Sequence, residues 1–192
     1  MVTSIKDLNL TVLINNVGGS AVCKPFEDYT ADEVDAMMNL NARFPTLLTR
    51  ALLPTFTRKV GPSLIVNVGS LGTVGVPYVV PYGGSKAFNM SASTSLEVEL
   101  RVEGKRIEVL ALLVGKVTGV GHSQDPVTFF TPGARTMARA ALGRVGCGRA
   151  EVVGYVGHAM QKFVFDALPM WARESVLVPV MKGYKEEYLR SK

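Results

Sequence analysis

A tyrosine, a lysine and a serine form the part of this sequence best suited to acid–base chemistry. Tyr82 and Lys86 stand four residues apart, so on a helix their side chains project from one face. An ammonium beside a phenol stabilises the phenolate form, which suits a proton donor that works near neutral pH. Ser70 follows the apolar run 64–68, typical of a buried parallel strand. Because open α/β sheets bind ligands at the carboxyl ends of their strands, we expect the site there.

The Tyr-x-x-x-Lys spacing is not specific by itself, and this chain contains it twice. The second copy, Tyr188 and Lys192, lies in a charged tail with no serine-ended strand before it, and we interpret it as a decoy. Two further polar elements precede the first copy in the sequence. Asn41 lies in a predicted helix, and the segment 15–18, Asn-Asn-Val-Gly, follows a short apolar strand.

These elements, in this order, resemble the short-chain dehydrogenase/reductase superfamily, whose active site holds Asn, Ser, Tyr and Lys on a Rossmann-type sheet. The resemblance implies that Tyr82 donates a proton, Ser70 holds a carbonyl oxygen, and Lys86 makes the phenol more acidic and contacts the cofactor ribose. It implies that Asn41 holds a water of the proton relay. A solvent-facing asparagine at position 41 is the alternative.

The same resemblance implies a cofactor site. Residues 15–18 match the Asn-Asn-Ala-Gly element of the family, which supports the sheet and lines the adenosine side of the cofactor, although an ordinary strand-to-loop turn is the alternative. NADP is the implied cofactor, and NAD stays open because the residues that distinguish the two have no counterpart here. The implied cofactor contacts are Asn15, Asn16, Gly18, Tyr82 and Lys86.

Length and composition fit one globular α/β domain. The chain has 192 residues, of which 47% are hydrophobic, enough for a sizeable core. No apolar run reaches the roughly 18 residues that a membrane-spanning helix needs, and the N-terminus does not look like a signal peptide. Cys23 and Cys147 are too few and too far apart for a disulfide framework or a zinc site, so we expect a reducing compartment.

A net charge of +5 could indicate a nucleic-acid-binding protein, but the basic residues are spread along the chain except in the tail 182–192. That tail also holds Glu186 and Glu187, so a solvated helix face explains it better and no nucleic acid is expected. A basic surface is equally compatible with an acidic substrate such as an acyl-CoA and with an anionic membrane surface.

Predicted strands and helices alternate along the chain. Apolar runs at 10–14, 64–68, 106–114 and 152–157 indicate buried strands. A capping box at Thr30 starts one helix, whose predicted buried face is Val34, Met37, Met38, Phe44, Leu47, Leu48, Ala51 and Leu52. Further helices are expected from Tyr82 to near Gly104, from a Thr131 cap to Gly146, and over 159–168. This order predicts right-handed βαβ units and a parallel sheet.

The segment 115–121 matches Gly-x-x-x-Gly-x-Gly, the spacing of a phosphate-binding turn. A phosphate turn must open onto a helix, whereas a loop sequence follows here, so we interpret the segment as the substrate loop of the family. The proline and threonine of that loop correspond to Ala111 and Lys116, or to a shifted register that uses Thr118. His122 and His158 are isolated, and we treat both as structural.

From Phe129 onward the sequence resembles the very-long-chain 3-oxoacyl-CoA reductases and their 17β-hydroxysteroid dehydrogenase relatives. This implies an acyl-CoA or steroid ketone substrate and the endoplasmic reticulum, although without a membrane helix a cytoplasmic or peripheral location is also compatible. Phe163, Phe165 and Trp171 would line an acyl channel, or belong to the core or to the packing face of a lid.

The matched part is about the C-terminal two-thirds of the family domain, so residues 1–192 are expected to form one partial, N-terminally truncated, doubly wound Rossmann-type domain. We expect an open edge at the first strand, low stability as a monomer and weak cofactor binding. The functional expectation is a ketone/alcohol oxidoreductase. The alternative is a catalytically dead homologue that pairs with a full-length reductase, for example through the Tyr82 helix.

Overall fold

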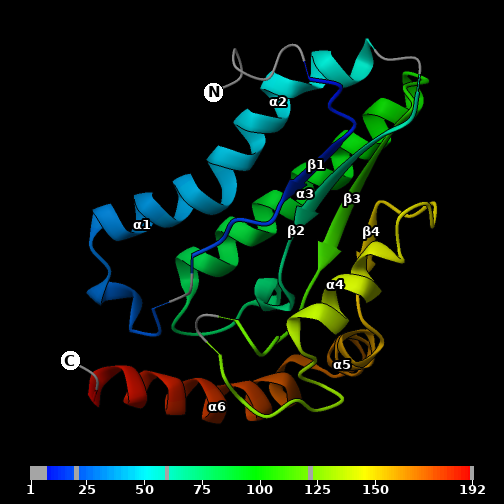
Figure 1. Cartoon of the computed structure of the whole chain (residues 1–192). Coiled ribbons are helices and arrows are strands. Elements are labelled where there is room, and N and C mark those ends of the chain that lie inside the picture. Colours follow the sequence, from blue (N-terminus) through cyan, green and yellow to red (C-terminus); the bar gives the residue numbers. More distant parts are fainter. Residues whose placement is uncertain (1–7, 20–21, 59–60, 121–122, 191–192) are drawn as a thin grey trace.

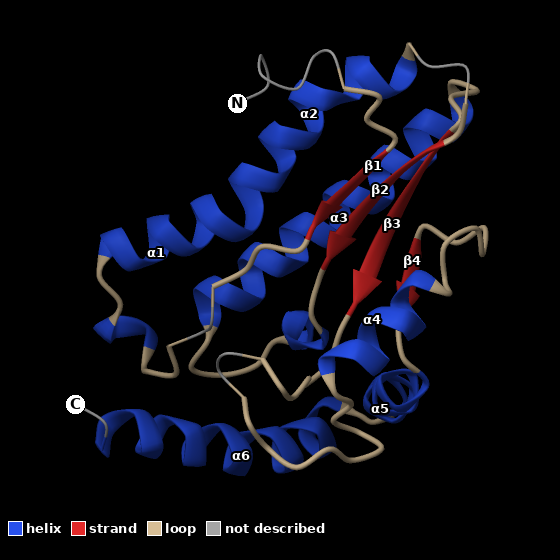
Figure 2. Ribbon diagram, in the orientation of Figure 1, coloured by secondary structure: helices blue, strands red, loops and turns tan. Residues whose placement is uncertain are grey.

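A parallel sheet forms the centre of the computed structural model, which describes residues 8–19, 22–58, 61–120 and 123–190. Within these ranges the sheet has four strands in the order β1-β2-β3-β4, all parallel (Figures 1 and 2). The strands are β1 (Val12–Asn15), β2 (Ser63–Val68), β3 (Ile107–Leu113) and β4 (Glu151–Val153). The predicted parallel α/β sheet is therefore confirmed, and its strands end together at one edge.

Helices connect and flank these strands. They are α1 (Ala31–Met38), a π-helical segment (Asn39–Arg43), α2 (Phe44–Thr57), α3 (Val80–Val102), α4 (Ala134–Leu142), α5 (Val156–Ala167) and α6 (Met170–Arg190), with short 3-10 turns at Phe26–Asp28 and Leu71–Val74. The capping box of α1 is confirmed, since Thr30 Oγ1 accepts from Glu33 N at 3.2 Å and Glu33 Oε2 accepts from Thr30 N at 2.8 Å. The predicted Thr131 cap is wrong, because Gly133 is the N-cap of α4 and no side chain caps it.

The two faces of the sheet are covered by different helices. On one face α2 and α3 pack around Ile65 and Val109 of the strands. On the other face Met137 and Ala141 of α4 pack on strand residues such as Val66. The strand order advances in one direction throughout, so the connection through α4 has the opposite hand to those through α2 and α3. The expectation of uniformly right-handed units is therefore wrong for β3-α4-β4, where α4 covers the face that α2 and α3 leave bare.

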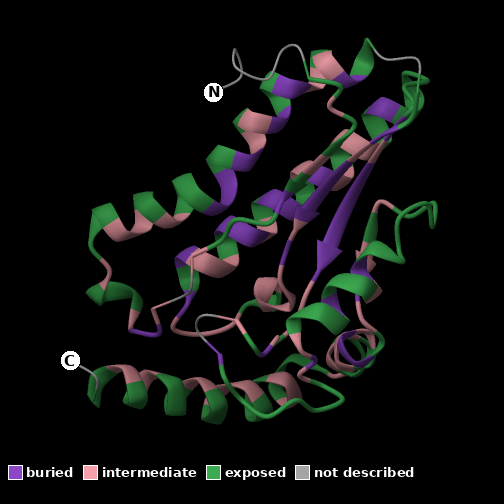
Figure 3. Ribbon diagram, viewed as in Figure 1, coloured by how far each residue is buried: buried purple, intermediate pink, exposed green. Residues whose placement is uncertain are grey.

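Strand β1 lies at an open edge of the sheet among the described residues. Val12 and Ile14 are 46% and 51% exposed, so the expected open edge is confirmed and the interpretation of this run as a buried strand is wrong. The predicted buried face of the first helix is also partly wrong, because Met38, Phe44 and Leu47 are exposed whereas Leu52 is buried. Figure 3 shows burial concentrated on β2, β3 and the inward sides of the helices.

A buried chain of polar side chains ties β1 and β2 to α2 and α3. Asn15 Nδ2 donates to Thr49 Oγ1 at 3.1 Å and to Asn67 Oδ1 at 2.6 Å. Asn67 Nδ2 in turn donates to Ser93 Oγ at 2.8 Å, and Ser93 donates to the carbonyl of Asn89 at 2.6 Å. Because these groups are buried, each depends on the others for hydrogen bonds that water would otherwise supply.

The substitution Asn67→Leu tests this network. It keeps a similar volume but removes the partner of Asn15 Nδ2 and the donor to Ser93, so we expect a loss of about 2 to 3 kcal/mol in the free energy of unfolding. Urea denaturation followed by circular dichroism measures this loss. The control Ser95→Ala, at an exposed position of α3, should stay within about 0.5 kcal/mol of the wild type. Equal unfolding midpoints for Asn67→Leu and the wild type would show that the network contributes nothing.

Candidate active site

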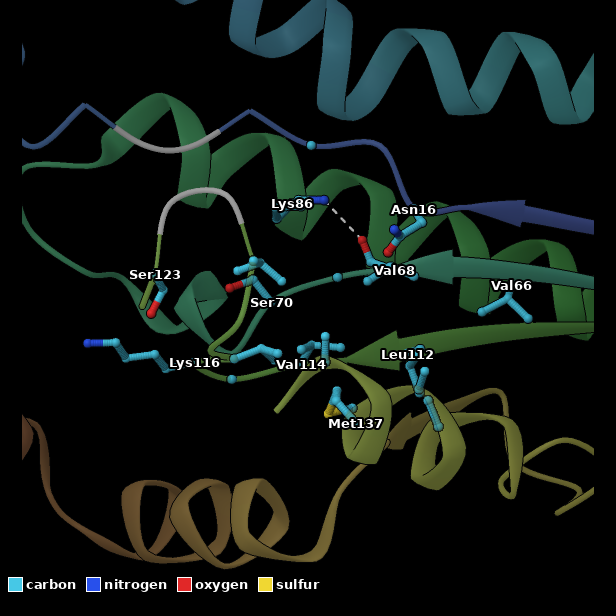
Figure 4. A pocket seen from close by; sticks show the side chains of 18 of the residues that line it. Asn16, Val66, Val68, Ser70, Lys86, Leu112, Val114, Lys116, Ser123 and Met137 are labelled. Carbon is cyan, nitrogen blue, oxygen red and sulfur yellow. Dashed lines mark hydrogen bonds between the residues drawn. The ribbon is translucent and has the colours of Figure 1, made fainter. Parts of the chain in front are cut away.

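A cavity of about 1190 Å³ opens at the carboxyl ends of β1, β2 and β3. Five of the seven residues that the resemblance assigns to catalysis or cofactor contact line it: Asn16, Gly18, Ser70, Tyr82 and Lys86. Figure 4 shows Asn16, Ser70 and Lys86 on successive elements around this space, with Lys116 from the loop after β3 at its other side. The structure thus brings together residues that are up to 70 positions apart in the sequence, from Asn16 to Lys86.

Ser70 and Tyr82 flank the same glycine. Ser70 Oγ accepts a hydrogen bond from Gly72 N at 3.0 Å as it caps the 3-10 turn that follows β2. A Cβ atom built on Gly72 would lie 3.3 Å from Ser70 Oγ and 3.6 Å from Tyr82 Cε1. Since the serine oxygen accepts the backbone bond, its hydroxyl proton can be donated to a carbonyl oxygen in the cavity.

Lys86 is buried beside these two residues, one turn along α3 from Tyr82. Its Nζ donates to the carbonyl of Val68 at 3.0 Å, drawn as the dashed line in Figure 4, and to that of Val17 at 3.5 Å. Burial lowers the pKa of the Lys86 ammonium, because desolvation disfavours the charged form. A Cβ atom built on Gly18 would lie 3.0 Å from this Nζ, so a side chain at position 18 would crowd the Lys86 amine.

Asn41 lies behind the cavity and does not line it. Its side chain is fully buried: Nδ2 donates to Ser85 Oγ at 3.1 Å, and Oδ1 accepts from Gly19 N at 3.2 Å. The solvent-facing alternative is therefore wrong. Asn41 belongs to the π-helical segment, in which the Phe44 amide bonds back to the Asn39 carbonyl, a feature that often occurs near functional sites. Asn41 thus contacts both the segment after β1 and the turn of α3 between Tyr82 and Lys86.

Two other expected site residues lie elsewhere. Asn15 points its amide into the buried network with Thr49 and Asn67, and it does not line the cavity. Ala111 is fully buried within β3 and packs with Met90 of α3, so the register that placed it in the substrate loop is wrong. A strand-end position could not be told from a mid-strand position without knowing where β3 stops.

The loop after β3 contributes an ion pair that the sequence did not indicate. Lys116 Nζ lies 2.7 Å from Asp125 Oδ2 and donates to Tyr184 Oη at 3.1 Å, and all three residues line the cavity. Thr118, the alternative family threonine, is buried and donates to the carbonyl of Asp125 at 2.6 Å. Tyr184 comes from α6, 68 residues after Lys116, and no local motif could have revealed it.

The remaining sequence candidates lie outside the cavity wall or outside the described residues. The glycine-rich run opens onto no helix among residues 115–120 and 123–133, because α4 begins only at Ala134. Gly121, His122 and Lys192 fall outside the described ranges. Phe163 and Trp171 are 75% and 73% exposed, so they belong neither to the core nor to the cavity. Among the described helices, none is long and apolar enough to cross a membrane.

Residues 4–125 match the family model of the short chain dehydrogenases. The chain belongs to this family. It is similar to a very-long-chain 3-oxoacyl-CoA reductase from Caenorhabditis briggsae, with 28% identity over 100% of this chain and 61% of the relative. It is also similar to a very-long-chain 3-oxoacyl-CoA reductase from Neurospora crassa, with 32% identity over 84% of this chain and 50% of the relative. The chain therefore spans about half to three-fifths of the length of these relatives.

Among solved structures, the short-chain dehydrogenase chain resembles the 3-ketoacyl-(acyl-carrier-protein) reductase from Brucella melitensis complexed with NADH. The two share 27% identity and a TM-score of 0.55, over 60% of this chain and 48% of the other. The Rossmann-type interpretation of the sheet is thus confirmed, and so is the likeness to very-long-chain 3-oxoacyl-CoA reductases.

Replacing Lys86 by methionine tests the cost of burying its charge. Because its native pKa is lowered, the unfolded chain holds this proton over a pH range in which the native protein has released it, so wild-type stability rises with pH up to about 10.4, the ordinary pKa of lysine. Lys86→Met lacks that gain. We expect the variant to unfold at higher urea than the wild type near pH 7, with the difference narrowing as the pH rises.

The exposed Lys105→Met provides the matched control and should follow the wild type at every pH. A difference between Lys86→Met and the wild type that stays constant from neutral to alkaline pH would show that burial of this amine carries no charge penalty.

Proposed function

We propose that this chain is a nicotinamide-dependent ketone reductase whose substrate is a 3-oxoacyl-CoA. The observation that carries the proposal is the convergence of Ser70, Tyr82 and Lys86 on one cavity at the carboxyl end of a parallel sheet, with Ser70 and Tyr82 against the same glycine. The names of the relatives from C. briggsae and N. crassa support the substrate class.

The three side chains divide the work on a ketone. The Ser70 hydroxyl donates a hydrogen bond to the ketone oxygen and holds it near Tyr82. Tyr82 gives its phenolic proton to that oxygen as negative charge develops there. NADPH, when bound, supplies the hydride. Lys86 places an amine one helical turn from Tyr82, and Asn41 supports this turn of α3 through Ser85. In the proposed role Asn41 holds the water through which the proton is replaced.

The residues around the cavity fit the nicotinamide riboside end of such a cofactor. Gly18 leaves backbone space beside Lys86 Nζ, and Asn16 lines the same wall, so a sugar hydroxyl can approach the amine. The described residues contain no glycine-rich turn that opens onto a helix N-terminus for the phosphates. We therefore propose NADP, with NAD equally compatible, bound weakly by this chain alone.

The apolar wall of the cavity supports an acyl substrate. The cavity lining includes apolar side chains of the sheet and of α4: Val66, Leu112 and Met137 pack together at its base, while Ala138 and Leu142 are exposed. A long hydrocarbon or a steroid would bury apolar surface there. A role in fatty acid elongation at the endoplasmic reticulum, with peripheral attachment, follows from this proposal. A hydroxysteroid ketone is the second substrate class that the wall accommodates.

Dimerisation through the Tyr82 helix is part of the same proposal. Phe88 and Val98 lie on α3 and are about half-exposed, which leaves apolar surface for a second helix.

Ketoreductase activity decides the proposal. Purified protein with NADPH and a 3-oxoacyl-CoA should show loss of nicotinamide absorbance at 340 nm, and Tyr82→Phe should lower kcat/KM by about 10² to 10⁴-fold because the general acid is gone. Tyr188→Phe, in the second Tyr-x-x-x-Lys copy, is the matched control and should retain the wild-type rate. An unchanged rate in Tyr82→Phe, or no turnover at saturating cofactor, would rule out this function.

A second candidate is a non-catalytic partner of a longer homologous reductase. The open edge of β1 supports it: among the described residues β1 pairs with β2 alone, and its Val12 and Ile14 side chains are exposed and apolar. Co-expression with such a reductase should then give a complex in size-exclusion chromatography that Ile14→Lys abolishes. A monomer that turns over substrate would remove this candidate.

A further inference from the structure

We propose that His158 is a positioning residue for the cavity: its imidazole holds the backbone of Gly115 and Lys116, and thereby sets where the Lys116 cation stands. His158 lies in the first turn of α5, does not line the cavity, and is fully buried. Its effect on substrate binding rests on the proposed ketoreductase function, whereas its hold on the loop does not.

Two hydrogen bonds fix the tautomer of the ring. His158 Nδ1 accepts from the Gly115 amide at 3.1 Å, and Nε2 lies 3.0 Å from the Lys116 carbonyl. A backbone amide can only donate, so Nδ1 must be bare and the proton must sit on Nε2, which donates to the Lys116 carbonyl. Burial lowers the pKa of His158 and outweighs hydrogen bonds to the Lys116 and Phe130 backbone, which raise it; the neutral ring is the form that the Gly115 bond requires.

The ring has little room to move. A Cβ atom on Gly115 would lie 2.7 Å from His158 Cδ2, so the turn passes against the imidazole at a distance that a side chain would prevent. The Tyr155 ring packs edge-on against the imidazole, with centroids 5.4 Å apart. Gly115, near the start of the loop after β3, is therefore held by both packing and a hydrogen bond.

The loop needs such an anchor. Lys116 pairs with Asp125, which lies further along the same loop, and it donates a hydrogen bond to Tyr184 of α6. All three residues line the cavity, so Lys116 connects the loop to α6 there. Its side chain and that of Asp125 are about half-exposed, and water screens exposed pairs of this kind, so they contribute little to stability. The pair cannot fix its own place, whereas a buried ring bonded to the Lys116 carbonyl can.

Three substitutions separate the two bonds. His158→Phe keeps an aromatic ring but removes both bonds. In His158→Asn the amide oxygen takes the place of Nδ1 and can accept from Gly115, and in His158→Gln the amide nitrogen reaches the position of Nε2 and can donate to Lys116. Lys162→Ala, further along α5 where Lys162 pairs with Asp166, is the control.

Hydrogen exchange of the Gly115 amide, followed by NMR, measures whether His158 holds the loop, and it requires no activity assay. In His158→Phe we expect the Gly115 amide to exchange about five- to tenfold faster, as for the loss of one hydrogen bond, with recovery in His158→Asn but not in His158→Gln. The wild-type ring should show the ¹⁵N shifts of the Nε2–H tautomer. An unchanged exchange rate in His158→Phe, no recovery in His158→Asn, or an Nδ1–H tautomer would overturn the proposal. If His158→Phe does not fold, His158→Gln provides the same loss at Gly115.

Kinetics test the consequence for the cavity. Because Ser70, Tyr82 and Lys86 stand on other elements, His158→Asn, which loses the bond to the Lys116 carbonyl, should raise the KM for 3-oxoacyl-CoA about tenfold and change kcat by less than about threefold. His158→Gln, which can keep that bond, should stay closer to the wild-type KM. An unchanged KM in His158→Asn would overturn the link to the substrate. Absence of turnover in the wild type would overturn the proposed function alone and leave the exchange result standing.

Discussion

The burial of one amine is the constraint on which the rest of the site depends. Lys86 can stay inside the protein only because two carbonyls, of Val68 and Val17, turn toward its Nζ. This requires that β2 end where it does, that the segment after β1 pass close by, and that position 18 carry no side chain. Sheet register, loop path and glycine placement must therefore all be compatible with this one buried amine.

The features that short sequence motifs encode could be predicted, whereas those that depend on strand pairing or on contacts between distant segments could not. Ser70, Tyr82 and Lys86 occur in short motifs at a strand end and on one helix face, and the structure brings them together as expected. The register that used Ala111 failed because the end of β3 depends on its pairing with β2. Tyr184 was missed because its approach to the cavity is a tertiary contact between segments far apart in the chain.

The burial predictions failed for a related reason. Helical periodicity identifies an apolar face, but it does not say whether anything covers that face. Phe44 and Leu47 fit the spacing and are nevertheless exposed, and Val12 and Ile14 of β1 are about half-exposed although they belong to an apolar run. The polar members of the same region behave in the opposite way, since Asn15 and Asn67 are buried and bonded to each other. Here polar side chains specify how strand and helix fit together.

The π-helical turn at Asn39–Arg43 has a consequence for insertions and deletions in this region. Such a turn corresponds to one extra residue in an α-helix, and each residue advances a helix by about 100°. Removing one residue there would rotate α1 relative to α2 and swing the Asn41 amide away from Ser85 and Gly19 even though the asparagine itself remained. The position of the Asn41 amide therefore depends on the number of residues in the π-helical segment as much as on the asparagine itself.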